Sequence, residues 1–368
     1  MANACIVLQK RIKPSDRGVI AVLNAFSVNG YTFEEVCFLL QLGETRLKEK
    51  LNALKQRAEN ILLIADKTAL PIVKGDIAEY FNENTAQNMY GGAGIFADEK
   101  NLLFLLSADE TDTGALYVKN ACVPYLQKKS GICYDKMTVR TIGANEARVN
   151  GLLTQITQMC GDKIHCFRTR KYDEDVIELT YDSTTPKMLT DDALRVLADG
   201  LGDTVYALNT DCRLEERLIE LLKLRRRKIS VAESFTGGGI AKRITSVSGA
   251  SEVYFEGLNT YDELSKMKRL GVSEYTLQTV GAVSDQTAYE MAAGLLQTGT
   301  CDISIATTGL AGPKSDRSML PVGLCYIAIG TKERVFVYRY KFDGTREEIT
   351  EKAINYALFL AYKQLKNT

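Results

Sequence analysis

Short apolar runs alternate with amphipathic stretches through the N-terminal part of the chain. The apolar runs predict β-strands, and the helical spacing of apolar residues between them predicts helices. Strands are expected over residues 4–10, 35–41, 60–65 and 101–107, and helices over 16–29, 44–58 and 115–129. In the second of these helices Leu47, Leu51 and Leu54 share one face. The alternation is typical of a doubly wound α/β domain with parallel crossovers, which we place at residues 1–133.

The pattern changes near residue 134 and again near residue 212. Strands over 137–142, 163–168 and 176–181, with helices over 146–160 and 191–201, predict a small α+β domain at residues 134–211. An α/β pattern returns in residues 212–368. Its strands are expected over 254–260, 303–307, 323–330 and 334–341, and its helices over 214–224, 262–270, 285–297 and 346–364. The sequence therefore predicts a three-domain α/β protein, as its length of 368 residues also favours.

One stretch of the third domain, KISVAESFTGGG at 228–239, has the pattern of a functional site. A short buried strand containing Ile229 and Val231 leads into a polar turn with Ser234, and three glycines then open a helix. A hydroxyl and exposed backbone N–H groups at a helix start suit an anion or a developing negative charge. The alternative is a tight connection in which the glycines allow close approach and Ser234 only caps the helix.

Composition narrows the chemistry. The 46 basic and 46 acidic residues cancel, so no overall charge favours nucleic acid or an anionic membrane. No apolar run is long enough to span a membrane, and residues 1–11 lack the order of a signal peptide, so we expect a cytoplasmic protein. The nine cysteines form no CxxC pair and are expected as reduced thiols. His165 is the only histidine, which excludes a multi-histidine metal site and favours lysine, tyrosine, hydroxyl or carboxylate chemistry.

Six blocks of the third domain, in one order, resemble a known family. They are AESFTGG at 232–238, YDELSK at 261–266, GAVS at 281–284, TTGLAGP at 307–313, PVGLCYIAI at 321–329 and FDGTREEI at 342–349. Together they resemble the C-terminal domain of the competence/damage-inducible protein CinA, the nicotinamide-nucleotide amidase family. The upstream pattern is similar to the full-length form of that family, which has a molybdopterin-binding-like first domain and a KH-like α+β middle domain.

The resemblance implies deamidation of nicotinamide mononucleotide to nicotinate mononucleotide and ammonia. Ser234 matches the serine of the AESCTGG block of the family and becomes the expected nucleophile, with Lys266 as general base and Tyr261 relaying or positioning the proton. The ordinary pKa of lysine is about 10.4, so to keep a lysine neutral near pH 7 its environment must destabilise the charged form by about 4–5 kcal/mol. Lys266 must therefore be poorly solvated. The alternative is an exposed lysine, as most lysines are.

The remaining site residues are expected to bind the substrate. The N–H groups of Thr236, Gly237 and Gly238 could form an oxyanion hole or hold a phosphate, and the sequence leaves this choice open. Thr308 and Gly309 are expected to line the same crevice, and Arg346 to bind a phosphate. The expected partner is a small pyridine nucleotide, with no metal, no other cofactor, no nucleic acid and no membrane. The family resemblance also implies a homodimer that associates through the first domain.

Several positions depart from the family pattern. Phe235 replaces a cysteine, and residues 262–264 are changed while Tyr261 and Lys266 are kept. In the first domain, ADKTALPIVKGD at 65–76 stands where the family has a glycine-rich turn, and LLSADE at 105–110 where it has a PGVP-type turn. We therefore expect the first domain to keep its fold without its pocket. The alternative to an amidase is a non-catalytic nucleotide-binding or scaffold protein with a degenerate site.

Overall fold

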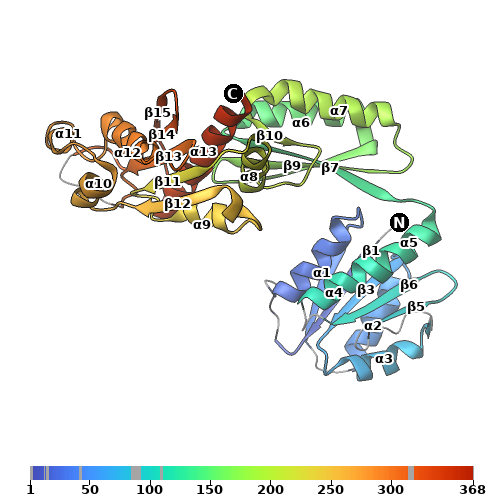
Figure 1. Cartoon of the computed structure of the whole chain (residues 1–368). Coiled ribbons are helices and arrows are strands. Elements are labelled where there is room, and N and C mark those ends of the chain that lie inside the picture. Colours follow the sequence, from blue (N-terminus) through green and yellow to red (C-terminus); the bar gives the residue numbers. More distant parts are fainter. Residues whose placement is uncertain are drawn as a thin grey trace. The chain divides into compact units, whose positions relative to one another are not determined.

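A computed structural model shows an α/β protein with three sheets, as the sequence predicts (Figure 1). It describes residues 3–11, 13, 16–40, 44–83, 93–107, 111–313 and 319–367. The chain forms two compact units, one of residues 1–136 and 180–186, the other of residues 137–179 and 187–368. The domain limits 1–133, 134–211 and 212–368 stay predictions. Within the described residues, no helix is long and apolar enough to cross a membrane.

The first unit is a doubly wound domain. Its sheet has the order β2-β1-β3-β6-β5-β4, and its first four strands are parallel. The strands are β1 (Asn3–Gln9), β2 (Glu35–Leu40), β3 (Asn60–Ala65), β4 (Asn82–Glu83), β5 (Gly94–Ala97) and β6 (Leu102–Ser107). The helices are α1 (Arg17–Ser27), α2 (Glu44–Lys55), α3 (Leu70–Ala78), α4 (Thr111–Tyr117) and α5 (Val123–Ser130). Helices α1, α4 and α5 cover one face of the sheet, and α2 and α3 the other.

Two elements of this unit differ from the sequence prediction. The segment at 65–76 that lacks the glycine-rich turn contains most of helix α3. Pro71 lies in the first turn of this helix, a position where the missing proline N–H costs nothing. The single helix expected over 115–129 is instead α4, a π-helical turn at Val118–Cys122, and α5. Pro124 lies at the start of α5 and cannot donate the usual backbone hydrogen bond, which accounts for the irregular turn before it. Residues 108–110 of the LLSADE stretch lie outside the described residues.

The second sheet has the order β10-β7-β9-β8. Its strands are β7 (Tyr134–Ile142), β8 (Ile164–Lys171), β9 (Glu174–Asp182) and β10 (Val205–Leu208), and its helices are α6 (Glu146–Cys160) and α7 (Lys187–Leu201). The four-residue strand β10 is too short to give a clear pattern in the sequence. Tyr172 and Asp173 join β8 to β9 with φ angles of 52° and 61°, the geometry of a tight hairpin turn.

The third sheet has the order β12-β11-β13-β14-β15. Strands β12, β11 and β13 are parallel, β14 is antiparallel to β13, and β15 is antiparallel to β14. The strands are β11 (Ile229–Glu233), β12 (Tyr254–Asn259), β13 (Ile303–Gly309), β14 (Leu324–Thr331) and β15 (Val335–Lys341). The helices are α8 (Leu214–Arg225), α9 (Gly239–Thr245), α10 (Glu263–Leu270), α11 (Glu274–Thr279), α12 (Asp285–Gln297) and α13 (Arg346–Asn367).

The two faces of this sheet differ in side-chain size. Val231 and Ile305 pack against α8, α9 and α13, whereas Ala232, Ala306 and Ala328 pack under α10, α11 and α12. Successive residues of a strand point to opposite faces, so the apolar runs of β11 and β13 are buried on both sides. The alanine face lets α12 approach the sheet closely.

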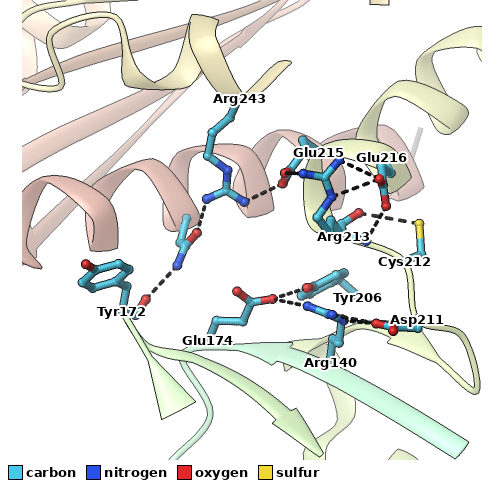
Figure 2. A network of polar contacts seen from close by, with 11 residues as sticks. Arg140, Tyr172, Glu174, Tyr206, Asp211, Cys212, Arg213, Glu215, Glu216 and Arg243 are labelled. Carbon is cyan, nitrogen blue, oxygen red and sulfur yellow. Dashed lines mark hydrogen bonds and ion pairs between the residues drawn. The ribbon is translucent and has the colours of Figure 1, made fainter. Parts of the chain in front are cut away.

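A network of polar contacts connects the second sheet to the helices of the third (Figure 2). Arg140 of β7 pairs with Glu174 of β9 at 3.1 Å and with Asp211 at 2.6 Å, and Tyr206 of β10 donates its hydroxyl hydrogen to the same Glu174. Burial is the main cause that raises the pKa of Tyr206 above its ordinary value, and the nearby Glu174 carboxylate raises it further. This hydroxyl therefore stays protonated, and a donor, even at a pH near the ordinary tyrosine pKa of about 10.

Helix α9 is tied into the same network by Arg243. Its guanidinium pairs with the buried Glu215 of α8 and donates to the side-chain oxygen of Asn355 of α13. The amide nitrogen of Asn355 donates in turn to the carbonyl of Tyr172 at 2.8 Å. Arg213 lies 3.2 Å from the Glu215 carboxylate. The network thus joins α8, α9 and α13 to the hairpin turn of the second sheet.

We predict that Glu215→Ala destabilises the second unit, because it leaves the Arg243 guanidinium without its partner carboxylate. The expected loss in the free energy of unfolding is about 3 kcal/mol, the lower end of the range for broken buried pairs, because both arginines reach solvent. Urea denaturation followed by circular dichroism measures this loss. Glu220→Ala, which breaks the exposed Arg217–Glu220 pair of the same helix, is the matched control and should cost less than about 1 kcal/mol. Equal losses in the two variants would contradict the prediction.

Candidate functional site

The candidate site lies where the parallel strands of the third sheet end. Ser234 directly follows β11, Thr260 and Tyr261 follow β12, and Thr307 and Thr308 lie near the end of β13. In the strand order, β12 lies on one side of β11 and β13 on the other. The loop that follows β11 therefore lies between the carboxyl ends of β12 and β13. Crevices at the carboxyl ends of such strands are the usual ligand sites of open α/β sheets.

Ser234 and Lys266 are in direct contact in this position. The Lys266 Nζ lies 3.1 Å from the Ser234 Oγ, although the two residues are far apart in the sequence. The same Nζ donates to the carbonyl of Thr260 at 2.7 Å and to the carbonyl of Tyr261 at 3.1 Å. Ser234 is 8% exposed and Lys266 only 1% exposed. Lys266 is therefore the poorly solvated lysine that the sequence argument requires, and not an exposed one.

The environment of Lys266 favours its neutral form. Burial lowers the pKa of Lys266 below its ordinary value, and the carboxylates of Glu263 and Asp262 only partly oppose this. Among the residues that the structure describes, no carboxylate oxygen lies within 4.0 Å of the Nζ. A neutral amine has two hydrogens and one lone pair. When the two carbonyls accept the hydrogens, the lone pair faces the Ser234 hydroxyl, as a general base for that hydroxyl must.

The loop after Ser234 is closed by a carboxylate that sequence reasoning missed. The Glu233 carboxylate accepts hydrogen bonds from the N–H groups of Gly238 at 3.1 Å, Ile240 at 3.1 Å and Ala241 at 2.8 Å. The Gly237 N–H donates to the carbonyl of Ser234 at 3.1 Å. The N–H groups of Gly237 and Gly238, which the sequence suggests as donors to an oxyanion or a phosphate, are thus already engaged inside the chain. The signal in the sequence is a carboxylate just before a glycine-led helix start.

The hydroxyls of the two threonines expected at the site also have partners in the chain. Thr236 and Thr307 share a hydrogen bond of 2.8 Å between their Oγ1 atoms, and Thr308 donates its hydroxyl hydrogen to the carbonyl of Ala282. At Gly309 a Cβ would lie 2.5 Å from the Cβ of Cys325, so close packing requires this glycine. Thr308 and Gly309 shape the end of β13 beside Ser234, and their expected contact with substrate stays a prediction.

Tyr261 and Arg346 meet at the exposed rim of the site. The Arg346 guanidinium donates to the Tyr261 hydroxyl at 3.4 Å and to the carbonyl of Gly312 at 2.7 Å. Tyr261 is 63% exposed, and only its main-chain carbonyl contacts Lys266. In this arrangement its phenol contacts Arg346, and its expected role in relaying or positioning the proton stays a prediction.

The third-domain departures from the family pattern make no described hydrogen bond to the Ser234 Oγ or the Lys266 Nζ. Phe235 is buried among Cys325, Phe342, Ile349 and other apolar residues, so it belongs to the core. Residues 262–264 form the start of α10, where the Asp262 side chain caps the helix and the other two side chains are exposed. Within the described part of the chain, no three His, Cys, Asp or Glu residues lie close enough to hold a metal ion.

Comparisons with known proteins show the family of this chain. The model of the CinA C-terminal domain matches residues 211–365. A putative competence-damage inducible protein from Caldicellulosiruptor saccharolyticus is 36% identical over 247 residues, which are 67% of this chain and 60% of that protein. The chain belongs to the CinA family. It spans about 60% of the length of the first such relatives.

Solved structures were compared as well. The competence/damage inducible protein CihA from Agrobacterium tumefaciens is 36% identical to this CinA-family chain, with a TM-score of 0.40, over 42% of this chain and 93% of that one. The molybdopterin biosynthesis moea protein from Pyrococcus horikosii aligns with 39% of this chain and 41% of its own, at 12% identity and a TM-score of 0.28.

The lowered pKa of Lys266 predicts a pH dependence of stability in this CinA-family protein. Between the folded pKa of Lys266 and the ordinary value of 10.5, the unfolded chain binds more protons than the folded chain, so the free energy of unfolding rises with pH. We expect the parent to gain stability relative to Lys266→Met as the pH rises toward 10.5, with a slope of at most about 1.4 kcal/mol per pH unit.

Urea denaturation at a series of pH values measures this difference. Lys268→Met, a lysine on the exposed side of the same helix, is the control and should follow the parent. Parallel curves for the parent and Lys266→Met would show that Lys266 has an ordinary pKa.

Proposed function

We propose that this chain is a metal-independent amidohydrolase that converts nicotinamide mononucleotide and water to nicotinate mononucleotide and ammonia. The observation that carries the proposal is the 3.1 Å contact between the Ser234 hydroxyl and the buried Lys266 amine. A serine paired with a neutral lysine is a recurring arrangement for hydrolysing amides. Membership of the CinA family supports the choice of a pyridine nucleotide as substrate.

The reaction proceeds in two halves. Ser234 Oγ attacks the carboxamide carbon while its proton moves to Lys266 Nζ, which forms a tetrahedral intermediate. Lys266 then returns the proton to the amide nitrogen, the C–N bond breaks, ammonia leaves and an acyl-serine remains. A water molecule, deprotonated by Lys266, attacks the same carbon and releases the nicotinate product, and the proton returns to Ser234. The carbonyls of Thr260 and Tyr261 hold the Lys266 amine toward Ser234 throughout.

The oxyanion of the intermediate needs N–H donors. The N–H groups of Phe235 and Thr236 follow the nucleophile directly, and we find no acceptor for either among the described residues. Donors at this position, just after a nucleophile at the end of a strand, are the usual components of an oxyanion hole. Of the three loop residues expected from the sequence, Thr236 is therefore the one that we propose for this role.

Arg346 is the proposed anchor for the phosphate. Its guanidinium lies beside Tyr261, and both of its described partners, the Gly312 carbonyl and the Tyr261 hydroxyl, are neutral, so its charge is available to an anion. A planar guanidinium suits a phosphate because it can donate two parallel hydrogen bonds. The homodimer and the absence of a nucleic-acid partner stay predictions.

The first experiment is a measurement of ammonia release from nicotinamide mononucleotide with a chelator present. We expect activity in the parent and a loss of at least about 10³-fold in Ser234→Ala and in Lys266→Ala, because each removes one member of a pair that acts as a unit. Lys268→Ala is the matched control and should keep the activity of the parent. A folded parent that binds the nucleotide without releasing ammonia would favour the alternative, a non-catalytic nucleotide-binding protein.

A second measurement tests Arg346. Arg346→Met should raise the KM for the mononucleotide by roughly 10- to 100-fold, the value of one charged hydrogen-bonded contact, with little change in kcat. The same variant should leave the KM for nicotinamide riboside, which lacks the phosphate, close to that of the parent. An equal rise for both substrates would mean that Arg346 does not contact the phosphate.

A further inference from the structure

We propose that Glu233 is a positioning residue for the Ser234 nucleophile, an inference that rests on the proposed amidase function. Its carboxylate accepts hydrogen bonds from backbone N–H groups and so holds the loop after Ser234 in one conformation. The evidence is the set of three backbone N–H groups that converge on one side chain, at 2.8–3.1 Å. Their residues, Gly238, Ile240 and Ala241, form the start of α9, which directly follows the loop.

Because Glu233 is buried and charged, the hydrogen bonds to its carboxylate are costly to break. Glu233 is 1% exposed, and among the described residues no lysine or arginine nitrogen lies within 4.0 Å of its carboxylate. A buried charge without an ionic partner is costly unless hydrogen bonds satisfy it. Here the charge is balanced by the three N–H groups and by the positive end of α9, so breaking these bonds is unfavourable.

The contacts of Glu233 fix Ser234 from both sides. The main chain of Glu233 belongs to β11, and its carbonyl accepts from the Thr260 N–H at 2.7 Å. The Ser234 N–H donates to the carbonyl of Thr307 at 3.1 Å. Beyond Ser234, the side chain of Glu233 reaches forward to Gly238. The nucleophile therefore lies in a short loop that is tied to the sheet at one end and to the carboxylate at the other.

Glutamate is the side chain that this geometry requires. Its Oε2 accepts from two N–H groups and its Oε1 from a third, so both oxygens must be acceptors. Glutamine has one acceptor oxygen and would turn an NH2 group toward a backbone N–H. Aspartate keeps both oxygens but is shorter by one methylene. Glu233 has no described contact with Ser234 Oγ or Lys266 Nζ, so it acts through the loop and not by transferring a proton.

A consequence concerns the phosphate of the substrate. The start of α9 already holds the carboxylate of its own chain, so the phosphate cannot use these three donors without displacing it. The backbone at Gly237 and Gly238 has φ angles of 62° and 94°, which glycine adopts without strain, so their conformation serves the loop that Glu233 closes. The phosphate must therefore bind at another part of the site.

The experiment compares Glu233→Gln and Glu233→Asp with the parent in the full chain. We expect kcat for ammonia release to fall by about 10- to 100-fold in Glu233→Gln, since small displacements of a nucleophile have effects of this size. The KM should change less than about 3-fold, because the carboxylate does not touch the substrate. The limb of the pH–rate profile on which the rate rises as Lys266 loses its proton should stay in place, because Glu233 has no described contact with the Lys266 Nζ. Glu256→Gln, at a half-buried glutamate on the neighbouring strand β12, is the matched control.

Hydrogen exchange gives a readout that needs no turnover. The amides of Gly238, Ile240 and Ala241 should exchange faster in Glu233→Gln than in the parent and in Glu256→Gln. If Glu233→Gln does not fold, Glu233→Asp, which keeps the charge, replaces it in both measurements with the same expected direction.

The outcomes separate the two proposals. Faster exchange with an inactive parent would reject the amidase and leave the loop-holding role of Glu233 standing. Unchanged exchange, or a raised KM with unchanged kcat, would overturn the inference about Glu233 whatever the activity.

Discussion

The site depends on the burial of one amine. Lys266 lies almost completely out of solvent, with two carbonyls and one serine hydroxyl around its Nζ and no described carboxylate within ion-pair distance. This environment disfavours the charged form, and burial is the main cause of the lowered pKa of Lys266. The carbonyls of Thr260 and Tyr261 hold that nitrogen beside the Ser234 hydroxyl.

The sheet explains how residues from three separate segments reach one place. The strands β12, β11 and β13 are parallel and adjacent, so their carboxyl ends lie at the same end of the sheet. Residues of the site follow β11 and β12 directly and lie near the end of β13. The two faces of β11 and β13 are covered by different helices. The carboxyl ends of these strands are the part of the sheet that the helices leave uncovered. A change of strand order would separate Ser234 from Lys266 even if every local element formed correctly.

Much of this could be predicted from the sequence, because periodicity and motifs are local signals. The bounds of α6 and α12 match the prediction, and the contact of Ser234 with Lys266 agrees with the expected pairing. Glu233 was missed because its role depends on three N–H groups that come together only when the loop folds. The contact of the Tyr261 phenol with Arg346, which lies 85 residues away in the sequence, was likewise not predicted. Such long-range contacts leave no periodic signal.

The second sheet extends the support of the site through α13. Tyr172, at its hairpin turn, donates its hydroxyl hydrogen to Glu347 at 2.8 Å. Its carbonyl accepts a hydrogen bond from the Asn355 side chain. The same helix begins with Arg346 and packs Ile349 and Ala353 in the cluster that contains Phe235, the residue after the nucleophile. A shift of α13 would therefore move Arg346 and disturb the packing beneath Ser234 together. The contacts of the hairpin turn oppose such a shift. The second sheet therefore helps to hold α13, the helix that carries Arg346 and packs against Phe235.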